Sequence, residues 1–174
     1  MPGICVALDI ETTGLRPESD AIIEVGAVKF QGDRVLDTFT SLVNPQRPVP
    51  RKIQTLTGIS ANDLDKAPPA SAVLPRLNTF LKDYPVIGHN VSFDLAFLKA
   101  QNVGLANPPL DTFELAGLIL PKMASYSLEQ LTKALGLSSP TYHRALADAN
   151  LAKDLYLALL ARALDLDLAT VQEI

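Results

Sequence analysis

The sequence predicts an α/β fold in which a central mixed five-stranded sheet is flanked by α-helices. Short segments rich in Val, Ile and Phe come first, short apolar segments then alternate with helical patterns, and helical patterns close the chain. This order is typical of a mixed sheet covered by helices. With 174 residues, of which 48% are hydrophobic and 20% charged, we expect residues 1–174 to form a single domain.

Three strands are expected in the first part of the chain, over 4–8, 21–30 and 35–43. The turn-like segments 14–20 and 31–34 separate them. Because the connections are short, neighbouring strands can only run in opposite directions. The first half therefore predicts an antiparallel meander.

The second part of the chain is expected to be mostly helical. Apolar residues follow helical spacing over 71–81, with Ser71 as the N-cap, and 86–88 and 110–111 are expected to be short strands. A short helical turn is expected around 53–56. The further expected helices cover 93–100, 113–120, 127–135 and 145–164.

An acidic pair follows the first expected strand. Asp9 and Glu11 stand two positions apart at the end of the apolar run 4–8. Because side chains alternate along a strand, the two carboxylates project from the same face and converge. At a separation of about 4 Å they repel by roughly 4 kcal/mol at an effective dielectric of roughly 20, so a proton or a cation must relieve the repulsion. Hard oxygen ligands favour magnesium or manganese.

Two later segments add further acidic residues. Asp94 lies in the first turn of the helix expected over 93–100, where a carboxylate can also serve only as a capping charge. His143 and Asp148 stand five positions apart at the start of the helix expected over 145–164. This spacing lets both side chains reach one side of the helix.

The composition narrows the setting. A net charge of −4 argues against a polyanionic partner, unless four carboxylates hold two divalent cations and so neutralise the site. The single cysteine, Cys5, allows no disulfide framework, and no segment approaches the ~20 apolar residues of a membrane span. We therefore expect a cytoplasmic protein with no membrane partner. Phosphate contacts would depend on local basic residues such as Arg51, Lys52, Lys122 and Arg144.

Three segments together resemble the motifs of the DEDDh family, the DnaQ-like 3′-5′ exonucleases. VALDIETTGL is similar to the first motif, GHNVSFDLAFL to the second and YHRALADA to the third, and they occur in the family's order. The intervening segments IIEVGAVKF, IQTLTGIS, LDTFELA and YSLEQL are also similar, so the resemblance extends from about Val6 to about Leu157. It implies a ribonuclease H-like fold.

The resemblance also implies a set of functional residues. Asp9, Glu11, Asp94 and Asp148 would hold two divalent cations, Mg²⁺ or Mn²⁺, and His143 would act as general base. Two such ions can stabilise the attacking and the leaving oxygen of a displacement at phosphorus. An imidazole can accept a proton from the attacking water at neutral pH. The expected product is a 5′-mononucleotide released from a 3′ end.

Residues near these motifs are candidates for substrate contacts. Gly14 would let the backbone approach the terminal nucleotide, a neighbouring threonine would bond to the 3′-hydroxyl, and Leu15 would wedge against the terminal base. Phe93 would either stack on the scissile nucleotide or belong to the core. The candidates for substrate binding are Thr12, Thr13, Gly14, Leu15, Asn90, Phe93 and His143. His89 and Asp111 are expected to be structural, with Asp111 bonded to nearby backbone.

The leading hypothesis is a 3′-5′ exonuclease on single-stranded or frayed DNA that proofreads for a replicative polymerase, as a separate subunit or a fused domain. The metal-binding motifs do not indicate whether the substrate is DNA or RNA. An exonuclease that trims RNA or short oligonucleotides is therefore an alternative. A second alternative is a catalytically silent docking module for a polymerase or helicase. The presence of all four acidic residues and of His143 argues against it. An endonuclease or integrase on the same scaffold would usually lack the third motif.

Overall fold

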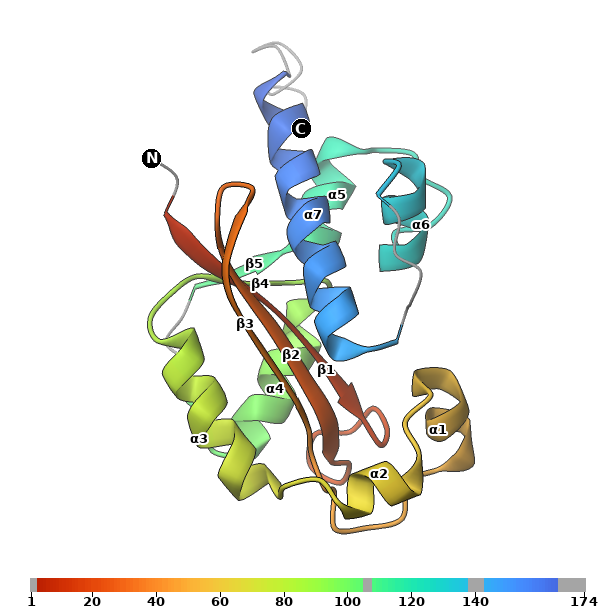
Figure 1. Ribbon diagram of the computed structural model, residues 1–174. Coiled ribbons are helices and arrows are strands. Elements are labelled where there is room, and N and C mark those ends of the chain that lie inside the picture. Colours follow the sequence, from red (N-terminus) through yellow and green to blue (C-terminus); the bar gives the residue numbers. More distant parts are fainter. Residues whose placement is uncertain (1–2, 105–107, 138–142, 166–174) are drawn as a thin grey trace.

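A five-stranded sheet runs through the centre of the protein, with its strands in the order β3-β2-β1-β4-β5 (Figure 1). The structure is a computed structural model, and it describes residues 3–104, 108–137 and 143–165. The strands are β1 (Ile4–Thr12), β2 (Ile22–Gln31), β3 (Arg34–Leu42), β4 (Val86–Gly88) and β5 (Pro109–Asp111).

The first three strands form the expected antiparallel meander, because β2 pairs antiparallel with both β1 and β3. The two short strands join the sheet by parallel pairing: β4 is parallel to β1, and β5 is parallel to β4. The prediction of a mixed five-stranded sheet flanked by helices is confirmed.

Strand β1 is longer than its apolar run. The sequence predicts a strand over 4–8, but β1 continues to Thr12 because its backbone stays paired with β2 as far as Thr12 opposite Ile22. A register irregularity between Glu11 and Thr12 precedes the end of the pairing. The ladder therefore carries the acidic pair inside the strand.

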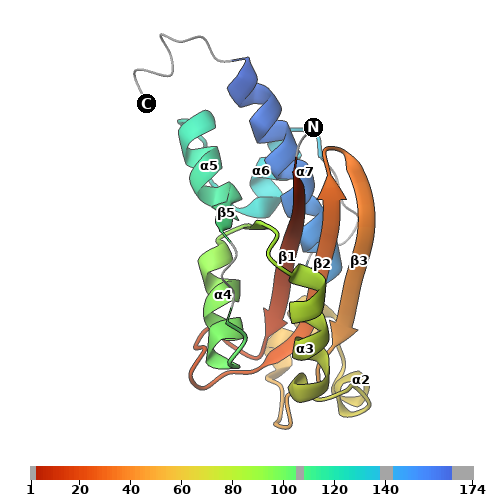
Figure 2. The ribbon, with the colours of Figure 1, turned by 90° about the vertical axis from the view of Figure 1, so that its left-hand side faces the viewer.

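Helices cover both faces of the sheet. Val6 and Leu8 of β1 pack with Val73 and Leu77 of α3 and with Phe97 of α4 on one face (Figure 1, Figure 2). On the other face Ala7 and Val28 pack with Ala149 of α7. This alternation follows from the two-residue period of a strand. The helices are α1 (Arg51–Thr57), α2 (Ala61–Asp65), α3 (Ala70–Leu81), α4 (Val91–Ala100), α5 (Thr112–Ile119), α6 (Leu128–Ala134) and α7 (Ala145–Leu164).

Two helix predictions need correction. Ser71 does not cap α3, which begins after Pro69; the extended ψ of 160° at Pro69 turns the chain into the helix without a side-chain cap. Helix α2 was not predicted, although Ser60 and Asp63 form a reciprocal capping box at its start. Its five residues are too few for a periodic apolar pattern, so only the cap could have indicated it.

The long helix α7 also organises the remaining helices. Leu155 and Leu159 on α7 pack with Ala116 of α5 and Leu131 of α6 in a separate buried cluster. Both leucines are fully buried. Within the described ranges, none of the helices combines the length and the apolar character needed to cross a membrane.

Candidate active site

The carboxyl-terminal half of β1 brings two acidic side chains to the face that α7 covers. Asp9 lies opposite Gly26 of β2, and Glu11 lies opposite Glu24. Ala7, two residues earlier on the same face, is fully buried under α7. The sheet therefore places both carboxylates next to the start of α7.

Asp94 reaches the same place from α4. Its side chain is buried, and its Oδ1 accepts a hydrogen bond of 3.0 Å from the backbone N–H of Ile10, between the two acidic residues of β1.

Asp111 fixes the start of α4 by accepting hydrogen bonds from the N–H groups of Asn90 and Val91 at 2.9 and 3.0 Å. The prediction that Asp111 is structural and bonds to nearby backbone is confirmed.

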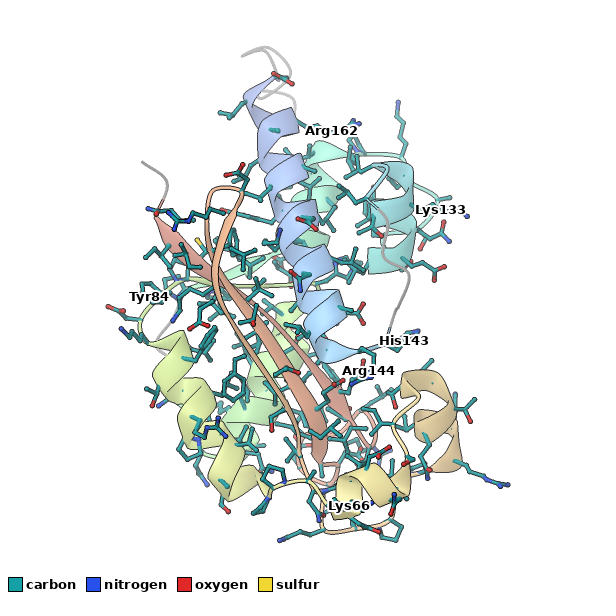
Figure 3. The ribbon with its side chains drawn as sticks, in the orientation of Figure 1. Lys66, Tyr84, Lys133, His143, Arg144 and Arg162 are labelled. Atoms are coloured by element: carbon teal, nitrogen blue, oxygen red, sulfur yellow. The ribbon has the colours of Figure 1, made fainter. Side chains whose placement is uncertain are left out.

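His143 and Asp148 approach from the start of α7. His143 lies just before the helix (Figure 3), and its backbone N–H donates to Asp148 Oδ2 at 2.9 Å. Glu11, His143 and Asp148 each offer a ligand atom, and these three atoms lie within 4.8 Å of one another. Residues far apart in the sequence therefore meet at one point.

The site brings together acidic groups whose charged form the surroundings disfavour. Burial, reinforced by repulsion from Asp94 and Asp148, raises the pKa of Asp9 well above its ordinary value. Burial and the nearby Asp148 raise the pKa of Glu11 to about 7, and burial raises that of Asp94 to about 8 despite the Ile10 N–H. Burial also raises the pKa of Asp148. Bound cations would favour the charged form of these carboxylates and offset their mutual repulsion.

One oxygen shows this deficit directly. Asp148 Oδ1 is buried and has no hydrogen-bond partner among the described residues. A buried polar atom without a partner is rare in folded proteins and indicates an ion or water that belongs there. Together with the oxygen-rich ligand set, it fits a hard divalent cation such as Mg²⁺ or Mn²⁺.

A cleft of about 260 Å³ opens over these groups. One of its walls is apolar, formed by Phe93 and by Leu128 at the start of α6. Phe93 also packs against Phe97, with ring centroids 5.0 Å apart, so it belongs to both the core and the cleft. Sequence analysis did not single out Leu128. The cleft is lined by Asp9, Ile10, Glu11, His89, Asn90, Phe93, Asp94, Leu128, His143 and Asp148.

Thr12 and Thr13 form hydrogen bonds with the loop that follows β1. Thr13 donates its hydroxyl to Asp20 Oδ1 at 3.2 Å and accepts the Ala21 N–H at 2.9 Å, while the hydroxyl of Thr12 donates to the carbonyl of Gly14. A Cβ at Gly14 would lie 2.5 Å from the Asp20 carboxylate, so a larger residue there would displace Asp20 from its contact with Thr13. In contrast, Leu15 is 81% exposed. Of these residues, Leu15 has the freest side chain for an external contact.

His89 bridges three segments at the edge of the cleft. Its Nδ1 lies 2.9 Å from the hydroxyl of Thr112, and its Nε2 lies 2.8 Å from the carbonyl of Tyr126. Since a carbonyl only accepts, Nε2 carries the proton. Burial lowers the pKa of this imidazole. These contacts agree with the structural role expected for His89.

Gly26, which was not predicted as a site residue, allows α7 to pack close to the site. A Cβ at Gly26 would lie 2.1 Å from the backbone nitrogen of Leu146 and 2.2 Å from the carbonyl carbon of Ala145. Only glycine lets the first turn of α7 pack this closely on β2. The signal in the sequence was a glycine inside an otherwise apolar strand.

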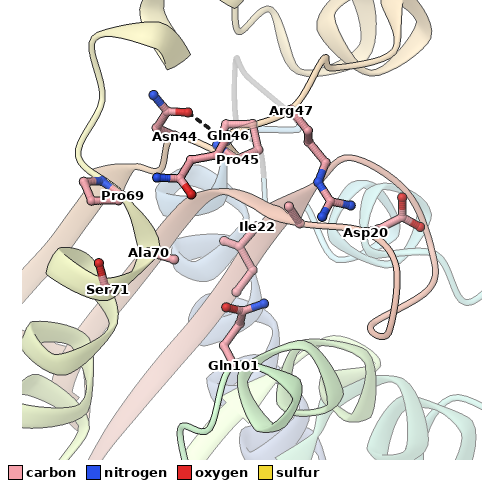
Figure 4. Close-up of a pocket in the computed structure, with 11 residues that line it drawn as sticks. Asp20, Ile22, Asn44, Pro45, Gln46, Arg47, Pro69, Ala70, Ser71 and Gln101 are labelled. Atoms are coloured by element: carbon pink, nitrogen blue, oxygen red, sulfur yellow. Dashed lines mark hydrogen bonds between the residues drawn. The ribbon is translucent and has the colours of Figure 1, made fainter.

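A separate cavity of about 330 Å³ lies between the loop before β2, the segment after β3 and the start of α3 (Figure 4). Polar groups such as Asn44, Arg47 and Gln101 line it. None of the carboxylates at the end of β1 contributes to this cavity, so the acidic cleft remains the chemically distinctive one.

Comparison with known proteins identifies the family. Residues 6–156 match the family model RNase_T, described as exonuclease. The chain belongs to this exonuclease family. The resemblance to the DEDDh, DnaQ-like 3′-5′ exonucleases is thereby confirmed, and residues 6–156 form an exonuclease-family domain. Exonucleases of this family depend on divalent metal ions.

Similar curated proteins are DNA polymerases III of the PolC type. The Thermotoga maritima protein is 40% identical over 157 residues, which cover 87% of this chain and 11% of the relative. The Caldanaerobacter subterraneus protein is 36% identical over 178 residues, 100% of this chain and 13% of the relative. The exonuclease chain therefore corresponds to only a small part of these relatives.

Solved exonuclease structures share the fold. Exonuclease X in complex with 5′-overhanging duplex DNA has a TM-score of 0.77 at 24% identity, covering 90% of this exonuclease and 91% of that chain. Escherichia coli exonuclease I in complex with a 5cy-dT13 oligonucleotide has a TM-score of 0.79 at 18% identity, and the match covers 93% of this chain and 41% of that chain. The expected ribonuclease H-like fold is confirmed.

Proposed function

We propose that this exonuclease removes 5′-mononucleotides from the 3′ ends of single-stranded or frayed DNA, by two-metal-ion hydrolysis, in replication proofreading or repair. The observation that carries the proposal is the convergence of four buried or half-buried carboxylates with one histidine, together with the unpartnered oxygen of Asp148. A purely structural cluster has no reason to leave such an oxygen without a partner.

Four side chains would hold the cations: Asp9, Glu11, Asp94 and Asp148. Two divalent ions bound there would stabilise negative charge on the attacking and leaving oxygens of the phosphodiester. Asp94 also accepts the Ile10 N–H, so this carboxylate braces β1 as well as facing the cleft. Asp148 holds the backbone of His143 through one oxygen and keeps the other for a ligand.

His143 is the proposed general base. The residue is exposed, stands at the mouth of the cleft and has its backbone tied to Asp148. An imidazole there can accept a proton from the attacking water and release it to solvent. An exposed position suits this role because the proton must leave after each turnover.

The terminal nucleotide is proposed to lie between the apolar wall of the cleft and the loop after β1. Phe93 and Leu128 offer apolar surface for a base or sugar, and the exposed Leu15 would contact the terminal base. Gly14 keeps the loop backbone open to approach. Asn90 occupies a left-handed conformation with φ of 60°, where it would present its side chain to the cleft. The threonines at 12 and 13 would contribute mainly through the loop shape that they stabilise.

Preference for DNA is supported by the relatives. The curated proteins that match are DNA polymerases, and two of the solved neighbours are complexes with DNA. We propose that residues 1–174 act as one exonuclease domain, either inside a polymerase polypeptide or beside a polymerase or helicase partner. The small share of the PolC relatives that the chain covers agrees with such a modular role.

Matched DNA and RNA oligonucleotides with Mg²⁺ or Mn²⁺ test the proposal. We expect stepwise release of 5′-mononucleotides from the 3′ end of DNA, a slower reaction on RNA, and faster removal of a mismatched than of a paired 3′ nucleotide on a primer-template. Faster hydrolysis of RNA would indicate an RNA-trimming enzyme. Cutting of closed circular single-stranded DNA would contradict exonuclease-only action, and release equal to that of Asp9→Ala would indicate a silent docking module.

A further inference from the structure

An ion pair between a buried carboxylate and a partly exposed guanidinium lies beside the cleft, and neither residue belongs to the proposed metal ligands. Glu24 on β2 is only 2% exposed. Arg144 donates from its Nη2 to Glu24 Oε1 at 2.7 Å and from its Nε to both carboxylate oxygens at 3.1 Å. The backbone N–H of Ala145 donates to Oε2 at 3.0 Å. Both oxygens of this buried carboxylate are therefore satisfied by the start of α7.

The pair connects the two elements that carry the site. Glu24 lies opposite Glu11 in the β1–β2 ladder, and Arg144 directly follows His143 in the chain (Figure 3). Neither residue is part of the cleft lining. Their influence on the chemistry must therefore pass through the backbone of residues 143–145 and through charge.

The backbone at this point needs such support. His143 has a φ of 59°, in the left-handed region that is unfavourable for residues other than glycine. Arg144 is the N-cap residue of α7, and it provides no side-chain hydrogen bond to the helix end. Glu24 takes over that function from the neighbouring strand by accepting the Ala145 N–H. A carboxylate at a helix N-terminus is also favoured by the helix dipole.

We propose that Glu24 and Arg144 are positioning residues for the nuclease reaction. The pair locks the first turn of α7 onto β2, so that His143 and Asp148 face Glu11 across the cleft. The inference rests on the proposed function, because it assigns His143 and Asp148 to catalysis. It adds that their geometry is held by an ion pair outside the catalytic set.

The pair also places a fixed charge near the site. Arg144 is a cationic side chain that directly follows His143 and is bound to the carboxylate opposite Glu11. Its guanidinium is fixed by a two-pronged contact that lysine cannot reproduce.

The test uses Glu24→Gln, Arg144→Lys and the double variant, with Asp154→Asn as the control. Asp154 pairs with Lys153 on the same helix, but its side chain is 44% exposed and away from the cleft. We expect kcat on a DNA oligonucleotide to fall about 10- to 100-fold in each single variant, because small displacements of catalytic groups have effects of this size, while KM changes by less than about threefold. The double variant should be no slower than the slower single variant, since both break one unit.

Amide hydrogen exchange supplies a measurement that does not depend on activity. The N–H groups of Ala145 and His143 should exchange at least about tenfold faster in Glu24→Gln and Arg144→Lys than in the wild type or in Asp154→Asn. All assays should be run well below the melting temperature of each variant, so that a lower stability alone leaves kcat unchanged. Wild-type kcat in Glu24→Gln, a loss confined to KM, or unchanged exchange at these amides would overturn the proposal.

The two hypotheses fail in different ways. If the wild-type enzyme with Mn²⁺ releases no nucleotide, the proposed function fails, and the exchange rates at Ala145 and His143 still show whether the pair holds the start of α7. If the wild type is active and both pair variants match it in kcat, only the positioning role fails.

Discussion

Two buried acidic regions lie side by side on β1 and β2, and they are neutralised in different ways. On β2, Glu24 is paired with Arg144 and accepts a backbone N–H, so both of its oxygens have partners within the protein. On β1 and at the start of α7, the pKa values of Asp9, Glu11 and Asp148 are raised by burial, and Asp148 Oδ1 has no partner among the described residues. The chain thus supplies a counter-charge that pairs with Glu24, whereas the acidic group on β1 and α7 is the one that we propose binds cations.

The difference teaches how the same residue type serves two purposes. A buried carboxylate with a fixed guanidinium partner holds structure, and removing one partner leaves an uncompensated charge. A buried carboxylate without such a partner destabilises the fold until a ligand arrives, which is typical of functional sites.

Asp9→Asn should abolish most of the activity while leaving the fold intact. We expect nucleotide release to fall at least about a thousandfold, because a central metal ligand contributes several kcal/mol to the stabilisation of the transition state. The melting temperature without metal should stay equal or rise, since the change removes a repelled buried charge. Oligonucleotide hydrolysis and calorimetry check both statements. Asp37→Asn on the exposed edge strand is the control, and a large fall in melting temperature without metal would contradict the comparison.

His143→Ala should lower kcat about 100- to 1,000-fold, the range expected when a general base is lost. Because His143 is exposed, the free energy of unfolding should change little. Single-turnover hydrolysis at saturating Mn²⁺ measures the effect. Asn150→Ala, farther along α7, serves as the matched control, and equal activities of the two variants would remove His143 from the proposed mechanism.

Metal ions should reverse the pH dependence of stability. Glu11 and Asp94 have pKa values raised to about 7 and about 8 in the folded state, so the stability that their protons provide is present in acid and is lost as the pH rises through these values. Without metal, the melting temperature should therefore fall between pH 7 and pH 8. With Mn²⁺ at about 100 times its dissociation constant, binding should add about 2.7 kcal/mol and offset that fall.

Calorimetry at both pH values, with and without Mn²⁺, makes this measurement. Asp9→Asn should show a weaker response to the metal, because it lacks one ligand of the site. A melting temperature that rises with pH in the absence of metal would show that the acidic cluster does not carry the expected strain.

Gly26→Ala should have the smallest effect, about 2 kcal/mol of lost stability, because the new methyl group would overlap the backbone of Leu146 at 2.1 Å and push α7 away from β2. Urea unfolding measures it. Gly117→Ala on α5, where an added Cβ meets nothing within 4 Å, should be neutral or stabilising by up to about 1 kcal/mol. Equal stabilities of the two variants would mean that α7 does not depend on close contact with β2.

The sequence predicted most of the architecture, because local patterns carry it. Segments rich in Val, Ile and Phe predicted β2 and β3, and helical spacing predicted α3 and α7, all close to their observed bounds. The prediction of β1 as 4–8 stopped too early, since a strand persists wherever its backbone finds a partner and does not need apolar residues. Tyr142, the first residue of the third motif, and the apolar residues 166, 168 and 171, whose packing the sequence leaves open, lie outside the described residues.

The sequence also indicated which residues carry chemistry, but not what holds them. The spacing of Asp9 and Glu11 implied a shared face, and the three motifs indicated the family. In contrast, the roles of Glu24, Gly26 and Leu128 depend on contacts with residues up to 121 positions away, such as the bond from the Ala145 N–H to Glu24. No local pattern encodes such a distance.

Residue types and their spacing were enough to predict most strands and helices, the family, and the acidic and basic groups that we propose for the chemistry. These features depend on side-chain period and residue type, which are properties of neighbouring positions. The folded arrangement was needed to show that Glu24 is neutralised within the chain, whereas Asp148 Oδ1 has no partner among the described residues. That outcome depends on how closely α7 packs on β2, because burial and the distance between charges set the electrostatic energy, and both exist only in the folded protein.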